Sequence, residues 1–150
     1  MKNLFESGRA EELKARAALL MPDSPRLWGR MSVAQAMAHC AAGMEMATGD
    51  LLVPRVLIGR LIGGFVKPKV LGDDEPFRRG SPTAKKLVIA DERELDKERV
   101  RLCALIDRFA TAGPAGCTQH PHSFFGPLTP EEWAILTYKH LDHHLRQFGG

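Results

Sequence analysis

The sequence is poor in cysteine, with Cys40, Cys103 and Cys117 as its only three. Their number is odd and no two of them stand at Cys-x-x-Cys spacing, so the pattern is not that of a disulfide-stapled secreted domain. We therefore expect reduced thiols and a cytoplasmic protein. Cys40 and Cys103 are interpreted as small residues of the core.

Long hydrophobic runs and a strong excess of one charge are also absent. Residues 1–20 are charged and amphipathic, unlike the apolar core of a signal peptide. The most apolar segment, residues 51–66, is interrupted by arginines and glycines and is too short to cross a membrane. The formal net charge is only +3, and basic residues are mixed with acidic ones. We therefore expect neither a nucleic acid nor a membrane as partner.

Residues 51–66 nevertheless carry more apolar side chains than a small domain needs to cover its core. Large apolar patches often mark contacts between subunits, so a homodimer formed through this segment is one interpretation. Packing of the segment on its own chain is the alternative. Attachment to a membrane surface is a weaker third interpretation, because the apolar residues are not confined to one helical face.

The length of 150 residues fits one domain, residues 1–150, and 44% hydrophobic with 26% charged residues is typical of globular proteins. No segment alternates polar and apolar residues as a strand does. Four segments carry apolar residues at helical spacing and are predicted as long helices: 7–21, 32–47, 91–112 and 129–148. Capping-box pairs mark the starts of the last three: Ser32 with Gln35, Asp91 with Glu94, and Thr129 with Glu132.

The segment between the second and third long helices is less regular. We predict a short helix from Pro54 to Phe65 and then a loop from Lys67 to Ala84, long enough to form a lid or the border of a site. The predicted fold is therefore all-α. It is an up-down four-helix bundle with a short extra helix and a long loop between helices two and three.

Three histidines stand within five residues of the last predicted helix: His140, His143 and His144. Spacings of three and four place His140 and His144 one turn apart on the inward face, which runs from Trp133 to Phe148. His143 is offset from this face, so we place it at the flank. Asp142 is expected to be an exposed charge.

His39 is the only histidine on any other long predicted helix, and bundle interiors build metal sites from facing helices. With His140 and His144 it would offer three imidazoles to a divalent ion, zinc or nickel first, with manganese or iron as further candidates. Three ligands leave a position for water or a thiol, which loses its proton more easily there and becomes a nucleophile. The alternative for such a histidine pair is a surface or hydrogen-bonded pair without metal.

Other residues are candidates for the border of the site. Glu98 falls on the apolar stripe of the third long helix, where it either pairs with Arg101 or Lys97 or accepts a hydrogen bond from a ligand histidine. His122, in the loop before the last helix, is placed either at the mouth of the site or in solvent, and His120 has the same two interpretations.

Four blocks of the sequence carry a resemblance to a known family. They are Trp28-Gly29-Arg30-Met31-Ser32, Ala38-His39-Cys40, Pro82-Thr83-Ala84 and, most specific, Phe125-Gly126-Pro127-Leu128-Thr129 continuing through Trp133 to the block Tyr138–Gly149. Through them nearly the whole chain resembles the DinB-like superfamily of four-helix bundles, and within it a bacterial family of unknown function. One departure is Ser123, which stands where the family tends to carry a proline.

In that superfamily, one histidine of the second helix and a His-x-x-x-His pair of the last helix bind a divalent metal. By position these are His39, His140 and His144. Several relatives use the metal to activate a low-molecular-weight thiol, so the resemblance implies a metal-dependent enzyme of thiol-transferase or hydrolase type with a small-molecule substrate. The alternatives are a metal-binding stress or sensor protein without turnover, and a structural or interaction bundle that binds no metal.

Overall fold

The computed structural model describes residues 1–150 and contains five α-helices, two short 3-10 helices and no strand. The elements are α1 (Arg9–Leu19), α2 (Val33–Thr48), α3 (Leu57–Leu71), η1 (Lys85–Leu87), α4 (Leu95–Ala112), η2 (Gly113–Gly116) and α5 (Pro130–Arg146). The predicted all-α class is confirmed. None of the helices combines the length and the apolar character that crossing a membrane would require.

Two of the predicted capping boxes are confirmed, and they start the two helices that carry the histidines. At α2, the Ser32 hydroxyl accepts from the backbone N–H of Gln35, whose side chain accepts from the N–H of Ser32. At α5, Thr129 and Glu132 form the same reciprocal pair, and Pro130 is the first residue of the helix. Each box satisfies two backbone donors that a helix start otherwise leaves without partners.

The capping box predicted for the third long helix is wrong. α4 begins at Leu95, with Glu94 as an N-cap residue whose side chain makes no capping bond. The carboxylate of Asp91 pairs instead with the guanidinium of Arg93, at 3.0 Å between Asp91 Oδ2 and Arg93 Nε. The helix therefore begins after both residues of the predicted box.

The short helix between α2 and α4 is longer than predicted, which shortens the loop after it. α3 continues through Pro68 to Leu71, so the loop comprises residues 72–84 rather than 67–84. The Nζ atom of Lys139, on α5, donates to the carbonyl oxygens of Val70 (2.6 Å) and Asp73 (2.9 Å) at this end. These bonds satisfy carbonyls that a helix end leaves free.

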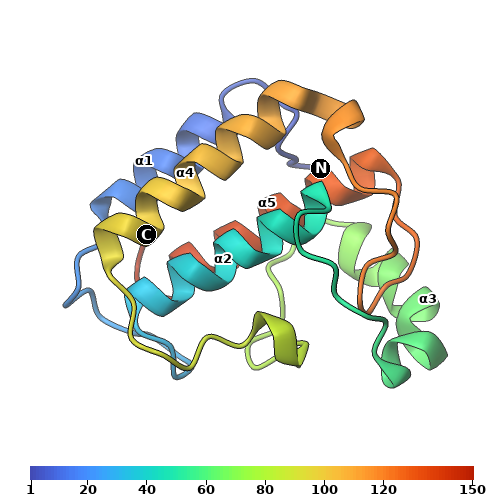
Figure 1. The fold of residues 1–150 in the computed structure, drawn as a ribbon, viewed down its shortest axis with the longest axis horizontal. Coiled ribbons are helices and arrows are strands. Elements are labelled where there is room, and N and C mark those ends of the chain that lie inside the picture. Colours follow the sequence, from blue (N-terminus) through green and yellow to red (C-terminus); the bar gives the residue numbers. More distant parts are fainter.

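The long helices do not alternate strictly in direction. The side chain of Gln35 bonds to the carbonyl of Asp91, and farther along both helices Glu45 pairs with Arg101, so α2 and α4 run parallel. Figure 1 shows this pair, with α1 beside α4 and α5 beside α2. A short connection would force α4 to run antiparallel to α2. Residues 49–94, which connect the two helices, are long enough to bring the chain back to the end at which α2 begins, so that α4 can run parallel to it. The direction of α4 corrects the strict up-down order predicted from the sequence.

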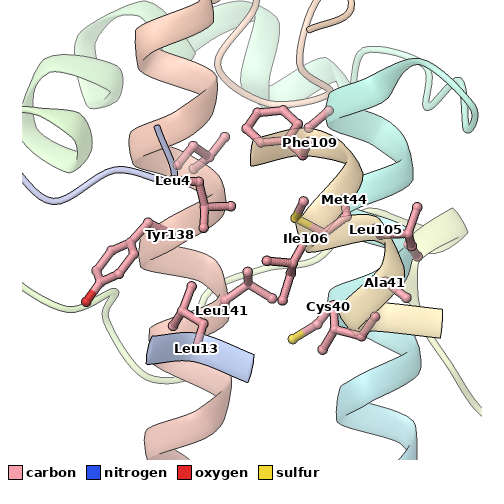
Figure 2. Packing of buried hydrophobic residues seen from close by; sticks show 14 of the residues in the cluster. Leu4, Leu13, Cys40, Ala41, Met44, Leu105, Ile106, Phe109, Tyr138 and Leu141 are labelled. Atoms are coloured by element: carbon pink, nitrogen blue, oxygen red, sulfur yellow. The ribbon is translucent and has the colours of Figure 1, made fainter. Parts of the chain in front are cut away.

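The core lies between α1, α2, α4 and α5, and α2 contributes mainly small residues to it. Figure 2 shows the side chains that meet there, among them Leu4, Leu13, Cys40, Met44, Ile106, Phe109, Tyr138 and Leu141. Alanines of α2 are fully buried at several positions, including Ala36, Ala41 and Ala47. Side chains this small allow α4 and α5 to approach the α2 backbone closely.

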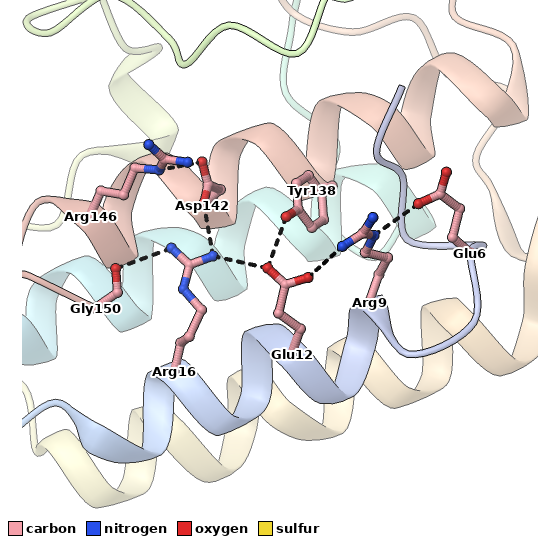
Figure 3. A network of polar contacts seen from close by, with 8 residues as sticks. All are labelled: Glu6, Arg9, Glu12, Arg16, Tyr138, Asp142, Arg146 and Gly150. Atoms are coloured by element: carbon pink, nitrogen blue, oxygen red, sulfur yellow. Dashed lines mark hydrogen bonds and ion pairs between the residues drawn. The ribbon is translucent and has the colours of Figure 1, made fainter.

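Polar side chains join α1 to α5 along one edge of the core (Figure 3). Glu12 accepts a hydrogen bond from the Tyr138 hydroxyl at 3.0 Å, and Arg16 pairs with Asp142 at 2.8 Å. Asp142 also pairs with Arg146 at 2.8 Å. The sequence-based expectation of an exposed charge at Asp142 is therefore wrong, because both arginines cover it. These contacts fix α5 parallel to α1.

Candidate metal centre

The structure brings His39 of α2 together with His140 and His144 of α5, and we call these three residues the histidine cluster. Nε2 of His39 lies 2.9 Å from Nε2 of His140. The ring centroids are between 4.7 and 4.9 Å apart for all three pairs. One ring nitrogen from each residue lies within 4.8 Å of the other two. The sequence-based grouping of these residues thus corresponds to a real cluster in the fold.

Gly43 allows α2 and α5 to approach each other at the level of the cluster. A Cβ atom at Gly43 would lie 2.9 Å from both Cε1 and Nδ1 of His140, closer than nonbonded atoms normally pack. His39 lies one turn before Gly43 on α2 and therefore faces the same side of α5. The absence of a side chain at Gly43 makes room for the His140 ring beside His39.

The fold determines which nitrogen of His39 carries the proton. Nδ1 of His39 lies 2.7 Å from the carbonyl oxygen of Leu87, in η1. Because a carbonyl oxygen can only accept, Nδ1 is the donor and Nε2 keeps its lone pair. The lone pair of His39 therefore faces His140 inside the cluster, where it accepts a hydrogen bond from Nε2–H of His140 at 2.9 Å.

A longer chain of hydrogen bonds determines the proton position on His144. The amide nitrogen of Gln147 donates to the carbonyl of Trp28 at 2.8 Å, which leaves the Gln147 oxygen to face His144. Nδ1 of His144 lies 2.9 Å from that oxygen and must donate to it, so Nε2 of His144 also keeps its lone pair. Gln147 was not among the predicted site residues, although its position three residues after His144 places it on the same helical side.

Burial keeps the cluster uncharged. His39 and His144 are only 4% and 8% exposed. Burial lowers the pKa of His39, and it lowers the pKa of His144 to about 3, helped by the nearby His39 ring. The pKa of His140 is lowered well below its usual value, first by burial and then by the neighbouring histidines. All three imidazoles are therefore neutral at physiological pH, the form that binds metals.

The donor set fits a single divalent cation. Two imidazole nitrogens bound to tetrahedral zinc at about 2.0–2.1 Å would be about 3.3 Å apart. Nε2 of His39 and Nε2 of His140 are 2.9 Å apart, the distance of a hydrogen bond between the two rings, so the rings would have to separate by about 0.4 Å to bind an ion. Two members of the cluster also direct their other N–H group to an oxygen acceptor, as metal-binding histidines do. The histidine cluster could thus hold a metal ion.

Aromatic side chains border the cluster on the side of loop 72–84. His143 lies between Trp28 and Phe77, with ring centroids at 5.4 and 6.0 Å, and the Phe77 ring is also 6.5 Å from His140. The guanidinium of Arg79 stacks over Trp28 at 4.2 Å. His143 is therefore at the flank where the sequence placed it, and the loop borders the cluster.

Glu98 does not contact the histidine cluster. Its buried carboxylate pairs with Arg93 at 3.0 Å and with Arg101 at 3.1 Å. Of the two roles considered for Glu98, the ion pair with Arg101 is the one that the structure contains. The oxygen acceptors of the cluster are Gln147 and the Leu87 carbonyl, and a backbone carbonyl leaves no signal in a sequence.

His122 stabilises the loop before α5 and is not in solvent. Its Nδ1 accepts from the backbone N–H groups of Phe124 (3.0 Å) and Phe125 (3.1 Å), and its ring lies 5.5 Å from Trp133. Burial and the charge of Arg55 lower its pKa to about 4. These contacts organise the loop, and none of them reaches the histidine cluster. His120 bonds through Nδ1 to the adjacent carbonyl and is likewise outside the cluster.

Comparison with known proteins gives one match. The family model described as "Protein of unknown function (DUF1569)" matches residues 5–149, which is nearly the whole chain. No curated protein and no solved structure matches the chain. The matched region includes every member of the histidine cluster, together with Trp28, Leu87 and Gln147.

Proposed function

The chain belongs to the DUF1569 family, whose description assigns no activity, and we propose that it is a divalent-metal-dependent enzyme of thiol-transferase or hydrolase type. The observation that carries this proposal is the histidine cluster itself. Three neutral imidazoles from two helices converge, and hydrogen bonds direct the lone pairs of two of them inward. Neutral imidazoles without carboxylates favour zinc or nickel over manganese or iron.

The arrangement of the helices supports a DinB-type bundle as the framework. Helices α1, α2, α4 and α5 pack around one core, and the candidate ligands come from the second and the last of these four. This is the distribution that the resemblance to the DinB-like superfamily implies. Kinship of folds does not determine a reaction, so the proposed chemistry depends on the cluster.

A metal held by three imidazoles supplies a Lewis acid that lowers the pKa of a bound water or thiol. The chain's own residues define the setting for that nucleophile. Hydrogen bonds hold the rings of His39 and His144 in place, and the Phe77 ring gives His140 an apolar neighbour.

No cysteine of the chain is suited to act as the nucleophile. Burial raises the pKa of the Cys40 and Cys103 thiols and raises that of Cys117 to about 11, so all three stay protonated near pH 7. The attacking group would therefore be water or a low-molecular-weight thiol brought in with a small-molecule substrate.

Elemental analysis of protein purified without a histidine tag tests the metal. We expect about one divalent ion per chain, lost in His39→Ala and in His144→Ala but kept in His120→Ala, whose ring bonds only to the adjacent Pro121 carbonyl. Wild-type protein that stays metal-free after incubation with zinc, nickel and manganese would refute the proposal.

Turnover is tested separately by screening the metal-loaded protein with electrophiles and esters, with and without cellular thiols. The expected result is product formation that disappears in both cluster variants. Metal binding with no reaction in any combination would favour a non-catalytic metal-binding stress or sensor protein instead.

A further inference from the structure

Helix α3 presents a continuous apolar surface that no other part of the chain covers. Its members, which we call the α3 stripe, are between 41% and 81% exposed: Leu57, Ile58, Leu61, Ile62 and Phe65. Their spacings of one, three and four residues place them on one side of the helix. In Figure 1, α3 lies at the edge of the molecule, apart from the four packed helices. Exposed apolar patches of this kind typically mark an interaction site.

The opposite side of α3 is already occupied by its own chain. Cβ atoms at Gly59 and Gly63 would lie 2.6 Å and 2.1 Å from the carbonyl oxygen of Phe124. The two glycines thus let the helix lie directly on the backbone of the loop before α5. In the sequence, the spread of apolar residues around this helix makes attachment to a membrane surface the weaker interpretation. In the structure, the side that carries Gly59 and Gly63 is covered by the loop before α5. What remains is a single exposed apolar stripe.

All charged residues of the helix that carries the stripe are basic. Residues 51–72 contain no acidic residue and four basic ones: Arg55, Arg60, Lys67 and Lys69. Arg60 and Lys69 are exposed and form no ion pair. Of the acids that flank the segment, Asp50 pairs with Arg108 and Asp73 with Lys139, whereas Asp74 and Glu75 follow the helix and form no ion pair. The basic residues Arg60 and Lys69 are therefore the free charges on α3 itself, on a protein of small net charge.

We propose that the α3 stripe attaches the protein to the surface of an anionic lipid membrane. A helix with an exposed apolar side and neighbouring basic residues can lie in the membrane interface, with Leu61 and Phe65 among the acyl chains and Arg60 and Lys69 among the headgroups. A second copy of the chain is the competing occupant. A twofold contact through the stripe would bring two basic helices together, with no acid in residues 51–72 to pair with their charges.

The test is co-sedimentation of the full chain with lipid vesicles. We expect binding to vesicles that contain phosphatidylglycerol, little binding to pure phosphatidylcholine, and weakening of the binding as salt rises from about 0.05 to 0.5 M. Replacing Arg60 or Lys69 by Gln should lower the affinity about fivefold each, from about 1 kcal/mol per charge near an anionic surface.

Two leucines of equal exposure provide a matched pair of variants. Leu57 on the stripe is 75% exposed and Leu19 at the end of α1 is 76% exposed. Leu57→Glu should lower vesicle binding about tenfold or more, whereas Leu19→Glu should leave it unchanged. Circular dichroism checks that both variants remain folded. The Gln variants of Arg60 and Lys69 provide a second test, because they leave the apolar surface intact.

Three outcomes would overturn the proposal. These are no binding to anionic vesicles, equal binding to both kinds of vesicle, and equal losses in Leu57→Glu and Leu19→Glu. Light scattering measures the oligomeric state and so tests whether a second copy of the chain covers the stripe. A wild-type dimer that Leu57→Glu converts to a monomer, in a protein that binds no vesicles, would assign the stripe to self-association.

Discussion

Replacing Gly43 by alanine should weaken metal binding without removing any candidate ligand. The added methyl group would lie 2.9 Å from Cε1 and Nδ1 of His140. Carbon atoms pack at about 3.5–4.0 Å, so the ring or the helix has to move by about 0.6 Å or more. His140 would then no longer keep its place beside His39.

The effects on stability and on metal affinity should differ. Alanine is favoured over glycine inside a helix by about 0.8–1.0 kcal/mol. Overpacking a core costs about 1–3 kcal/mol, so the free energy of unfolding of the metal-free protein should fall by about 0–2 kcal/mol. Metal affinity should fall about tenfold or more, the size of effect seen when the surroundings of a ligand are disturbed.

Isothermal titration with zinc and nickel measures the affinity, and thermal unfolding with and without metal measures the stabilisation. Gly64→Ala is the matched control, because a Cβ atom there meets nothing within 4 Å and the residue is exposed on α3. We expect the control to bind metal as the wild type does and to be slightly more stable. A Gly43→Ala protein with wild-type affinity would show that the packing of α2 on His140 does not position the ligand.

Three further predictions concern the surroundings of the cluster. Gln147→Leu removes the oxygen acceptor of His144 and should lower metal affinity about 10- to 100-fold in a competition titration, with the cluster residues intact. Metal-free protein should lose stability as pH falls below about 6.5, and urea midpoints measure this loss. The cause is burial, which lowers the pKa of His144 to about 3 and the pKa of His122 to about 4 in the folded state. The unfolded chain then binds protons that the folded chain does not, at about 1.4 kcal/mol per pH unit for each residue until its folded pKa is reached. Lys139→Met leaves the carbonyls at the end of α3 without their donor, so the free energy of unfolding should fall by about 1–3 kcal/mol and proteases should cleave loop 72–84 faster.

The parts of the fold that local chemistry decides were accessible from the sequence. The starts of α2 and α5 follow from Ser32 with Gln35 and from Thr129 with Glu132, because a capping box involves only residues three apart. The pairing of His140 with His144 follows from helical spacing in the same way. The capping-box rule is wrong for α4, which begins after both Asp91 and Glu94, and Asp91 pairs with Arg93 instead.

The parts that depend on contacts between distant segments were not accessible. The direction of α4 is decided by the route of residues 49–94, which no local pattern encodes. The role of Lys139 has no signal in the sequence, because its partners include backbone carbonyls at the end of α3. The contact of His39 with the Leu87 carbonyl cannot be predicted from the sequence for the same reason.

The same long-range contacts couple the candidate ligands to the border of the site. The carbonyl that orients His39 belongs to η1, directly after loop 72–84, and Phe77 of that loop packs against His140. A displacement of this segment would therefore remove the acceptor of the His39 Nδ1 proton and one apolar neighbour of His140 together. Once the acceptor is lost, the hydrogen bond that fixes the tautomer of His39 is gone, and its Nε2 lone pair is no longer held toward the cluster by that bond. The capacity of the cluster to bind a metal would thus depend on the position of one segment.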